Sequence, residues 1–369
     1  MNLTEREQEI VTLLRRDPLI GSAAIAEALG TTRAAVNVHL SNLTRKGVVL
    51  GRGYVLSEGA SVVVVGGANM DVKARSARAA VPGTSNPGAA TMAAGGVGRN
   101  IAENLARLGT RTYLVAAIGT DALGDQVLSA TSNAGVVVEH VRRSARSTGT
   151  YTAVLDADGE LVVAVADMAA TDELAPEQIA AARDLVAAAS LVVLDGNLAT
   201  ATLRYALELA ADVGTRVLLD PVSVPKAAAL APLLTPDRPV FAVTPNRDEL
   251  AALTDLPTGS RRQQERAARA LHERGVELVW VRLGPAGSML SSSEGVVSLD
   301  SVAPGAAGEV TDVTGAGDAM TAAFCHALLA GSPPAEAAAY GHAAAALTVA
   351  STDTVRPDLT DRLVRSLLS

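Results

Sequence analysis

An aspartate that follows two glycines at the start of an apolar run is the strongest chemical signal in this sequence. Asp318 comes after Gly315 and Gly317 in DVTGAGDAM (312–320), and the run TAAFCHALLAG that follows it directly predicts a helix. A carboxylate at a helix start can be a simple N-cap. A glycine-rich turn that enters a helix can instead bind an anion, because free backbone N–H groups point outward there. The segment alone leaves both interpretations open.

A second glycine-rich turn stands earlier in the chain, in AAGGVGRNIAENLARLG (93–109), ahead of another predicted helix. Gly95 and Gly96 would let a ligand approach the backbone closely, and the Asn100 side chain can both donate and accept hydrogen bonds. The turn lacks the dinucleotide-binding fingerprint, and the sequence contains no Gly-Lys-Ser/Thr of a Walker A loop. By itself such a turn does not identify a ligand.

Polar residues follow the ends of several predicted strands. Asn69 and Asp71 follow the apolar run SVVVVGG, and Asp195 and Asp220 end the runs SLVVLD and TRVLLD. Buried parallel strands have this composition, and ligands of open α/β sheets bind beyond the carboxyl ends of the strands. Asp71 is therefore placed to hydrogen-bond a polyol, with a turn-forming aspartate as the alternative interpretation.

Asn246 and Glu249 stand three residues apart in TPNRDE (244–249), where a predicted strand meets a helix. An Asn and a Glu at this spacing can form a capping box. Their oxygens could equally hold a hydrated Mg²⁺ through water. The two interpretations remain open at this point.

The composition favours a buried α/β protein. The chain has 369 residues, of which 49% are hydrophobic and 2% aromatic. No apolar run reaches the roughly 18 residues that span a bilayer, and the charged N-terminus lacks a signal-peptide core. A single cysteine excludes an internal disulfide and a cysteine-rich metal site. We therefore expect a cytoplasmic protein with no membrane partner.

Residues 1–56 differ in charge from the rest of the chain. They hold seven basic and five acidic side chains, a net +2 in a chain of net −8. Their pattern predicts a helix, then two helices joined by a tight turn, then a hairpin turning at Gly51-Arg52-Gly53. This arrangement resembles a winged helix-turn-helix DNA-binding domain, and a dimerisation or regulatory module of the same fold is the alternative. The resemblance implies DNA contacts from the following residues: Thr32, Arg33, Asn37, Arg45, Lys46 and Arg52.

The remainder resembles the ribokinase-like, PfkB-type carbohydrate kinases. GGVGRNIAENLARLG (95–109) and DVTGAGDAMTAAF (312–324) are similar to the two fingerprints of that family, and TPNRDE (244–249) and RLGPAG (282–287) to its magnesium-linked and nucleotide-binding elements. The resemblance implies a three-layer α/β/α sandwich over residues 61–369. It also implies a small β-sheet lid built from about 72–94 and 147–168, and we expect a linker at 57–60.

The resemblance assigns a role to each motif. Asp318 would be the catalytic base, and backbone N–H groups around Gly315, Ala316 and Gly317 would hold the transferred phosphoryl group. ATP and Mg²⁺ are the implied cofactors, a monovalent-cation requirement stays open, and Asn246 and Glu249 would hold the metal through water. Implied ATP-binding residues are Thr244, Asn246, Gly284, Gly287 and Thr314. Implied substrate-binding residues are Asn69, Asp71, Gly95, Gly96, Asn100, Asn86, Thr150, Tyr151 and Asp167.

Four further segments narrow the expected substrate. GGANMDV, SNPG, ADM and DPVS are most similar to family members that phosphorylate the 5′-hydroxyl of pseudouridine. On that interpretation Asn86, Thr150, Tyr151 and Asp167 are candidates for contacting the base. The alternatives are a kinase for ribose or another nucleoside, and a transcription regulator whose kinase-like body senses a ligand. The resemblance also implies a homodimer formed through the lid.

Overall fold

The computed structural model describes residues 3–50, 59–302 and 306–368. Its first part is a three-helix unit formed by α1 (Glu5–Arg16), α2 (Ser22–Ala28) and α3 (Arg33–Arg45). Ile10, Ile25 and Leu43, one from each helix, are fully buried against one another. The helix-turn-helix prediction is therefore confirmed, whereas the hairpin turn predicted at 51–53 lies outside the described residues.

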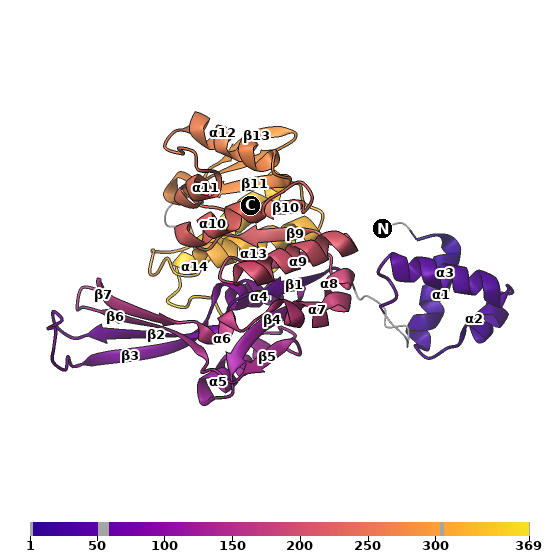
Figure 1. The fold of residues 1–369 in the computed structure, drawn as a ribbon, viewed down its shortest axis with the longest axis horizontal. Coiled ribbons are helices and arrows are strands. Elements are labelled where there is room, and N and C mark those ends of the chain that lie inside the picture. Colours follow the sequence, from indigo (N-terminus) through magenta and orange to yellow (C-terminus); the bar gives the residue numbers. More distant parts are fainter. Residues whose placement is uncertain (1–2, 51–58, 303–305, 369) are drawn as a thin grey trace.

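A nine-stranded sheet forms the centre of the larger part, in the order β13-β12-β11-β10-β9-β8-β1-β4-β5 (Figure 1). Neighbouring strands pair in parallel from β11 through β10, β9, β8, β1 and β4 to β5. Strand β12 pairs antiparallel with both β11 and β13. The strands are β1 (Ser61–Val65), β4 (Arg111–Gly119), β5 (Val141–Ser144), β8 (Leu191–Asp195), β9 (Val217–Asp220), β10 (Val240–Val243), β11 (Val276–Arg282), β12 (Ser288–Ser292) and β13 (Gly295–Leu299).

Apolar residues of the parallel strands fill two cores, one on each face of the sheet. On β1, Val62 and Val64 belong to one core and Val63 and Val65 to the other, because successive side chains point to opposite faces. The first core includes residues of α4 (Val97–Arg107), α13 (Ala316–Leu329), α14 (Pro334–Val349), α5 (Ala122–Asn133) and α15 (Asp361–Arg365). The second includes residues of α7 (Pro176–Ala181), α8 (Arg183–Ala188), α9 (Thr200–Val213), α10 (Val224–Leu230), α11 (Arg247–Thr254) and α12 (Arg261–His272). The predicted three-layer α/β/α sandwich is confirmed.

A separate four-stranded sheet projects from the sandwich, in the order β3-β2-β6-β7 (Figure 1). Its strands are β2 (Asn69–Ser76), β3 (Gly88–Gly95), β6 (Gly149–Leu155) and β7 (Leu161–Asp167), and the short α6 (Ala169–Asp172) follows β7. Parallel pairing of β2 with β6 brings Asp71 opposite Tyr151. The sheet thus joins two segments far apart in the sequence, and its base lies at the edge of the sandwich.

Candidate active site

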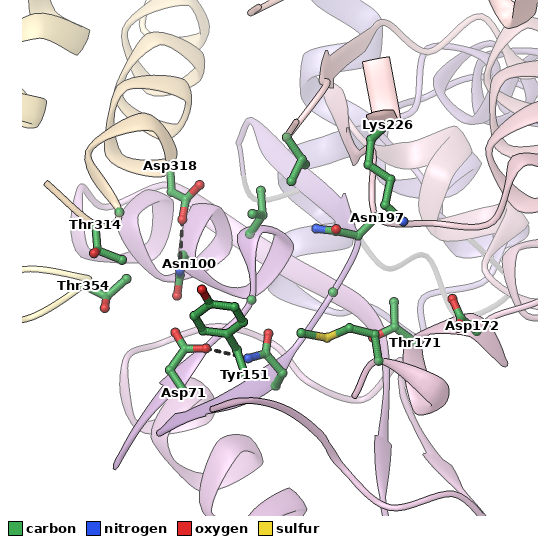
Figure 2. Close-up of a pocket in the computed structure, with 17 residues that line it drawn as sticks. Asp71, Asn100, Tyr151, Thr171, Asp172, Asn197, Lys226, Thr314, Asp318 and Thr354 are labelled. Carbon is green, nitrogen blue, oxygen red and sulfur yellow. Dashed lines mark hydrogen bonds between the residues drawn. The ribbon is translucent and has the colours of Figure 1, made fainter. Parts of the chain in front are cut away.

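A cavity of about 450 Å³ opens where the small sheet meets the loops that follow β1, β8 and β9 (Figure 2). Asp71 and Tyr151 enter it from the small sheet, Asn100 from α4 and Asp318 from α13. Its lining also includes Gly67, Asn69, Gly96, Val97, Met168, Thr171, Asp172, Asn197, Val222, Lys226, Thr314, Gly315 and Thr354. The two glycine-rich turns and the strand-end aspartate singled out in the sequence therefore meet at one site.

Glycines are required by the geometry at the start of α13. Gly315 is the N-cap, with φ of 80°, and a Cβ there would overlap the Thr354 carbonyl oxygen. A Cβ on Gly317 would lie 2.8 Å from Nη1 of Arg282. The first backbone N–H groups of a helix have no partner within the helix, and the helix dipole adds positive potential. The turn therefore places the N-terminus of α13, a type of helix end that suits an anion, beside Asp318.

Asp318 is a half-buried carboxylate in the first turn of α13. Its Oδ2 accepts a hydrogen bond from Nδ2 of Asn100 at 2.9 Å (Figure 2). Burial raises the pKa of Asp318 to about 8, with Asp220 and Asp195 adding to the rise, while the hydrogen bond from Asn100 opposes it. A carboxylate with a pKa near neutral pH is suited to accept a proton. The geometry does not make Asp318 an N-cap, since Gly315 occupies that position.

Asp71 is the second carboxylate of the cavity. Nδ2 of Asn69 donates to Oδ1 of Asp71 at 2.7 Å, and burial raises the pKa of Asp71. A Cβ on Gly95 would overlap the Asp71 carboxyl group, so the glycine makes room for the acid. Asn69 and Asp71 lie two residues apart on β2 and therefore face the cavity together. The side chains of Asn69, Asp71 and Asn100 can therefore form hydrogen bonds with adjacent hydroxyl groups of one ligand.

A buried aspartate that the sequence analysis assigned no role holds three cavity loops together. Oδ2 of Asp195 accepts hydrogen bonds from the N–H of Gly67 at 2.8 Å and of Gly98 at 2.7 Å, and Oδ1 accepts from the N–H of Asn197 at 2.8 Å. Burial raises its pKa to about 6, against these three hydrogen bonds. Asp195 is fully buried and does not line the cavity, so it positions the three cavity loops and is not placed to contact a ligand.

Arg282 lies beneath the N-terminus of α13. Its Nη1 is 3.3 Å from Oδ2 of Asp220, and its Nη2 is 3.5 Å from Oε2 of Glu249. Asp220 also accepts hydrogen bonds from the hydroxyls of Thr244 at 3.2 Å and Thr321 at 2.9 Å. The guanidinium therefore has a fixed position close to the helix end that Gly317 leaves open.

The capping box predicted at Asn246 and Glu249 is present. Oδ1 of Asn246 accepts from the N–H of Glu249 at 2.9 Å, and Oε2 of Glu249 accepts from the N–H of Asn246 at 2.8 Å. Within the described ranges no group of three His, Cys, Asp or Glu side chains converges to hold a metal ion. The capping box is therefore present, and a contact of these residues to a hydrated Mg²⁺ through water stays a prediction.

Several predicted ligand residues lie away from the cavity. Thr244 is fully buried, Gly284 begins an exposed 3₁₀ turn (Gly284–Ala286), and Gly287, which follows that turn, is buried. Asn86 lies in the loop between β2 and β3, where its amide bonds the backbone of Val81 and Thr84. These four residues do not line the cavity in this structure.

The predicted base-contacting residues on the small sheet are divided by the alternation of β-strands. Tyr151 lines the cavity, but Thr150 precedes it on β6 and therefore points to the opposite face. The Asp167 carboxylate accepts a hydrogen bond from the N–H of Ala169 at 3.1 Å and is not part of the lining. Of this group only Tyr151 is placed to touch a ligand.

The cavity contains residues that the sequence analysis did not select: Met168, Thr171, Asp172, Asn197, Val222, Lys226 and Thr354. Most follow strands β7, β8 and β9, so the rule that ligands bind beyond strand ends could have found them. Thr314, which was predicted, lines the cavity, and its hydroxyl donates to Oδ1 of Asp312 at 2.6 Å. Nζ of Lys73 donates to Oδ2 of the same Asp312 at 2.6 Å, which connects the small sheet to this loop.

The three-helix unit exposes part of its predicted DNA-contacting set. Thr32 caps α3, and Arg33, Asn37 and Arg45 are exposed along it. Lys46 is half-buried and its ammonium group bonds the Glu7 carboxylate at 2.7 Å, so it is held at the protein surface. Arg52 lies outside the described residues.

Comparison with known proteins agrees with this fold. Residues 60–361 match the family model described as pfkB family carbohydrate kinase, and residues 3–49 match the one described as winged helix-turn-helix DNA-binding. The sugar kinase YeiI of Escherichia coli strain K12, described as uncharacterized, is 35% identical over 358 residues, which cover 97% of each chain. The pseudouridine kinase of that strain is 32% identical over 308 residues, which cover 83% of this chain and 96% of the relative.

Among solved structures, Arabidopsis thaliana ribokinase complexed with ribose and ATP is similar with a TM-score of 0.74 at 27% identity, covering 84% of this chain and 99% of that chain. The fold is that of a sugar or nucleoside kinase. The chain belongs to the pfkB family of carbohydrate kinases, which are phosphotransferases with an alcohol acceptor, and it carries a fused winged helix-turn-helix domain. In the described part of the chain, no helix is long and apolar enough to cross a bilayer.

Proposed function

We propose that the protein transfers the γ-phosphoryl group of MgATP to the 5′-hydroxyl of pseudouridine. The observation that carries the proposal is the position of Asp318, which shares one cavity with Asp71 and Asn100 and lies at the anion-binding end of α13. A hydroxyl bound between these groups would meet a proton acceptor on one side and a phosphate site on the other. The similarity to a pseudouridine kinase over 83% of the chain supports the choice of nucleoside.

The proposed reaction assigns each group a part. The 5′-hydroxyl gives its proton to the Asp318 carboxylate as its oxygen forms a bond to the γ-phosphorus, and the bond from that phosphorus to the bridging oxygen of ADP breaks. N–H groups around Gly315, Ala316 and Gly317, with the charge of Arg282 beneath them, stabilise the negative charge of the moving phosphoryl group. Mg²⁺ enters with the nucleotide as part of the substrate, and Asn246 and Glu249 contact it through water.

The remaining predicted residues are proposed to complete the binding of the two substrates. Asp71, Asn69, Asn100 and the backbone at Gly95 and Gly96 hold the ribose hydroxyls. Thr314, which lines the cavity beside Gly315, lies on the nucleotide side, and Gly284 and Gly287 lie near the nucleotide base. The turn that begins at Gly284 is exposed and leaves room for such a contact.

A substrate panel tests this proposal. Purified protein is given MgATP and, separately, pseudouridine, uridine and ribose, while ADP release is followed and the product is located by ³¹P NMR. We expect the highest kcat/KM with pseudouridine and a phosphorus attached to the 5′ oxygen. Preferred turnover of ribose or uridine would reject pseudouridine as the substrate, and absence of turnover with all three would favour a ligand-sensing regulator.

We also propose that the three-helix unit binds DNA through the N-terminal part of α3. Thr32, Arg33 and Asn37 are exposed there, which is the part of a recognition helix that contacts base edges. The test is electrophoretic mobility shift with fragments upstream of the gene itself, using the full chain, Arg33→Ala and a matched Arg262→Ala on the kinase part. We expect salt-sensitive binding that only Arg33→Ala weakens. Equal binding by all three proteins would contradict the proposal.

We propose in addition that two copies associate through the small sheet. One stretch of β7 exposes apolar side chains: Leu161, Val163 and Val165 are 57%, 52% and 64% exposed. Exposed apolar patches of this kind mark interaction surfaces. Analytical ultracentrifugation of the full chain and of Val163→Lys should show a dimer and a monomer respectively; two identical sedimentation profiles would argue against this surface.

A further inference from the structure

The cavity has a second polar end, on the side opposite Asp318. Figure 2 shows Asp318 and Asn100 on one side, and Lys226, Thr171 and Asp172 on the other. The catalytic step described above uses none of the latter three. Three independent features of this end indicate that it takes a polar ligand group.

The first feature is an unsatisfied hydroxyl. Thr171 is 2% exposed and lines the cavity, and its Oγ1 has no hydrogen-bond partner among the described residues. A buried hydroxyl without a hydrogen-bond partner destabilises the fold, so native structures rarely keep one. A ligand group at this end of the cavity would satisfy it.

The second feature is an unpaired ammonium group. Lys226 on α10 is half-buried and lines the cavity, yet it forms no ion pair or hydrogen bond with the residues that the structure describes. Other buried cations of the site are paired, as Arg282 is with Asp220 and Glu249. Asp172, which also lines the cavity, has a carboxylate that is likewise unpaired within the described ranges.

The third feature is a strained turn that positions Lys226. Val222 lines the cavity with φ of 67°, a left-handed conformation that is rare for a β-branched residue. The N–H of Val222 donates to Oδ1 of Asp220 at 3.0 Å, which holds the turn in place. Backbone strain of this kind destabilises the fold and persists at ligand sites where the surrounding structure fixes it.

From these features we infer that Lys226, Thr171 and Asp172 form a subsite that selects the base of the nucleoside. Lys226 and Thr171 donate to a base carbonyl oxygen, and Asp172 accepts from a base N–H. Pseudouridine carries one ring N–H more than uridine, because its base is attached to the ribose through carbon. Asp172 accepts from this additional N–H and so separates the two nucleosides. The inference rests on the proposed function, since it takes the ribose to lie at Asp71 and Asn100.

The test measures nucleoside binding and turnover separately on the full chain. Calorimetric titrations use pseudouridine, uridine and ribose in the presence of a non-hydrolysable ATP analogue. The proteins are the wild type, Lys226→Met, Thr171→Val and Asp172→Ala, with Arg262→Met on the exposed face of α12 as the charge-removal control. We expect Lys226→Met to weaken pseudouridine binding about tenfold or more, because a charge-assisted hydrogen bond is lost. Ribose binding should change by less than about twofold, which also shows that the variants fold.

Asp172→Ala should weaken binding of pseudouridine but not of uridine, and Arg262→Met should change neither. Unchanged pseudouridine affinity in Lys226→Met and Thr171→Val would overturn the subsite, as would a wild type that does not bind pseudouridine. Equal losses for pseudouridine and uridine in Asp172→Ala would overturn the role given to Asp172. A wild type that binds pseudouridine but transfers no phosphate to it contradicts the proposed function and leaves the subsite standing.

Discussion

Replacing Asp318 by asparagine should remove activity while making the fold more stable. Asparagine has the same shape, and its oxygen can still accept the 2.9 Å hydrogen bond from Asn100, so the cavity should keep its form. It cannot accept a proton from the substrate hydroxyl. Loss of a general base typically lowers the rate by about 10²–10⁴, and we expect a loss of kcat in that range with KM for the nucleoside changed by less than about threefold.

The gain in stability follows from the raised pKa. The ordinary pKa of 3.8 applies to the unfolded chain and a pKa of about 8 to the folded one, so the folded state binds the proton more tightly. The free energy of unfolding of the wild type therefore falls as pH rises from about 4 to about 8. The full difference corresponds to about 6 kcal/mol. Asp318 faces an open cavity where solvent screens its charge, so we expect about 2 kcal/mol.

The assay is thermal unfolding of the wild type and Asp318→Asn at pH 5 and pH 8.5, alongside steady-state kinetics. At roughly 2 °C per kcal/mol for a chain of this size, the variant should gain about 4 °C in Tm at pH 8.5 and about a third of that at pH 5. A variant that loses stability at pH 8.5, or that keeps more than about a tenth of wild-type kcat, would refute the assignment of Asp318 as a buried base.

Three further predictions follow from the same site. The kcat/KM for the nucleoside should rise with pH up to about 8, because Asp318 must be deprotonated in the free enzyme, and a profile flat from pH 6 to pH 9 would contradict this. Gly315→Ala should lower Tm and kcat far more than Gly331→Ala at the other end of α13. Both glycines have positive φ, but only at Gly315 would a Cβ overlap a carbonyl oxygen. Equal losses of Tm and kcat in the two variants would count against a role of the turn at Gly315 in the site. Asp195→Asn should raise KM for the nucleoside about tenfold, because its one amide oxygen can replace only one of the two carboxylate oxygens and cannot accept from Gly67, Gly98 and Asn197 together. An unchanged KM would show that the loops hold without it.

Much of the fold could be predicted from the sequence because its signals are local. The apolar run at 61–65 indicates a buried parallel strand, and Val62 to Val65 indeed divide between two cores. The capping box at Asn246 follows from residue spacing alone, and it is present. The division of the small sheet into β2, β3, β6 and β7 depends on pairing across about 80 residues, which the sequence indicates only through its resemblance to a family.

The candidate site was predictable where glycine and acid occur together, as at Gly315 and Asp318. The sequence does not show which face of a strand meets the cavity, and a shift of one residue separates Tyr151, which lines it, from Thr150, which does not. Their places after strand ends put Thr171 and Lys226 near a ligand site, but the sequence does not show that their hydroxyl and ammonium groups lack partners among the described residues, because that depends on the tertiary arrangement.

The central claim concerns where the substrate oxygen lies relative to Asp318, and a crystal structure with pseudouridine and a non-hydrolysable ATP analogue measures it directly. We predict that the 5′ oxygen lies within hydrogen-bond reach of an Asp318 carboxylate oxygen, about 2.6–3.2 Å, with the γ-phosphate against the N-terminus of α13. A 5′ oxygen more than about 5 Å from Asp318, or a γ-phosphate bound elsewhere, would contradict the account.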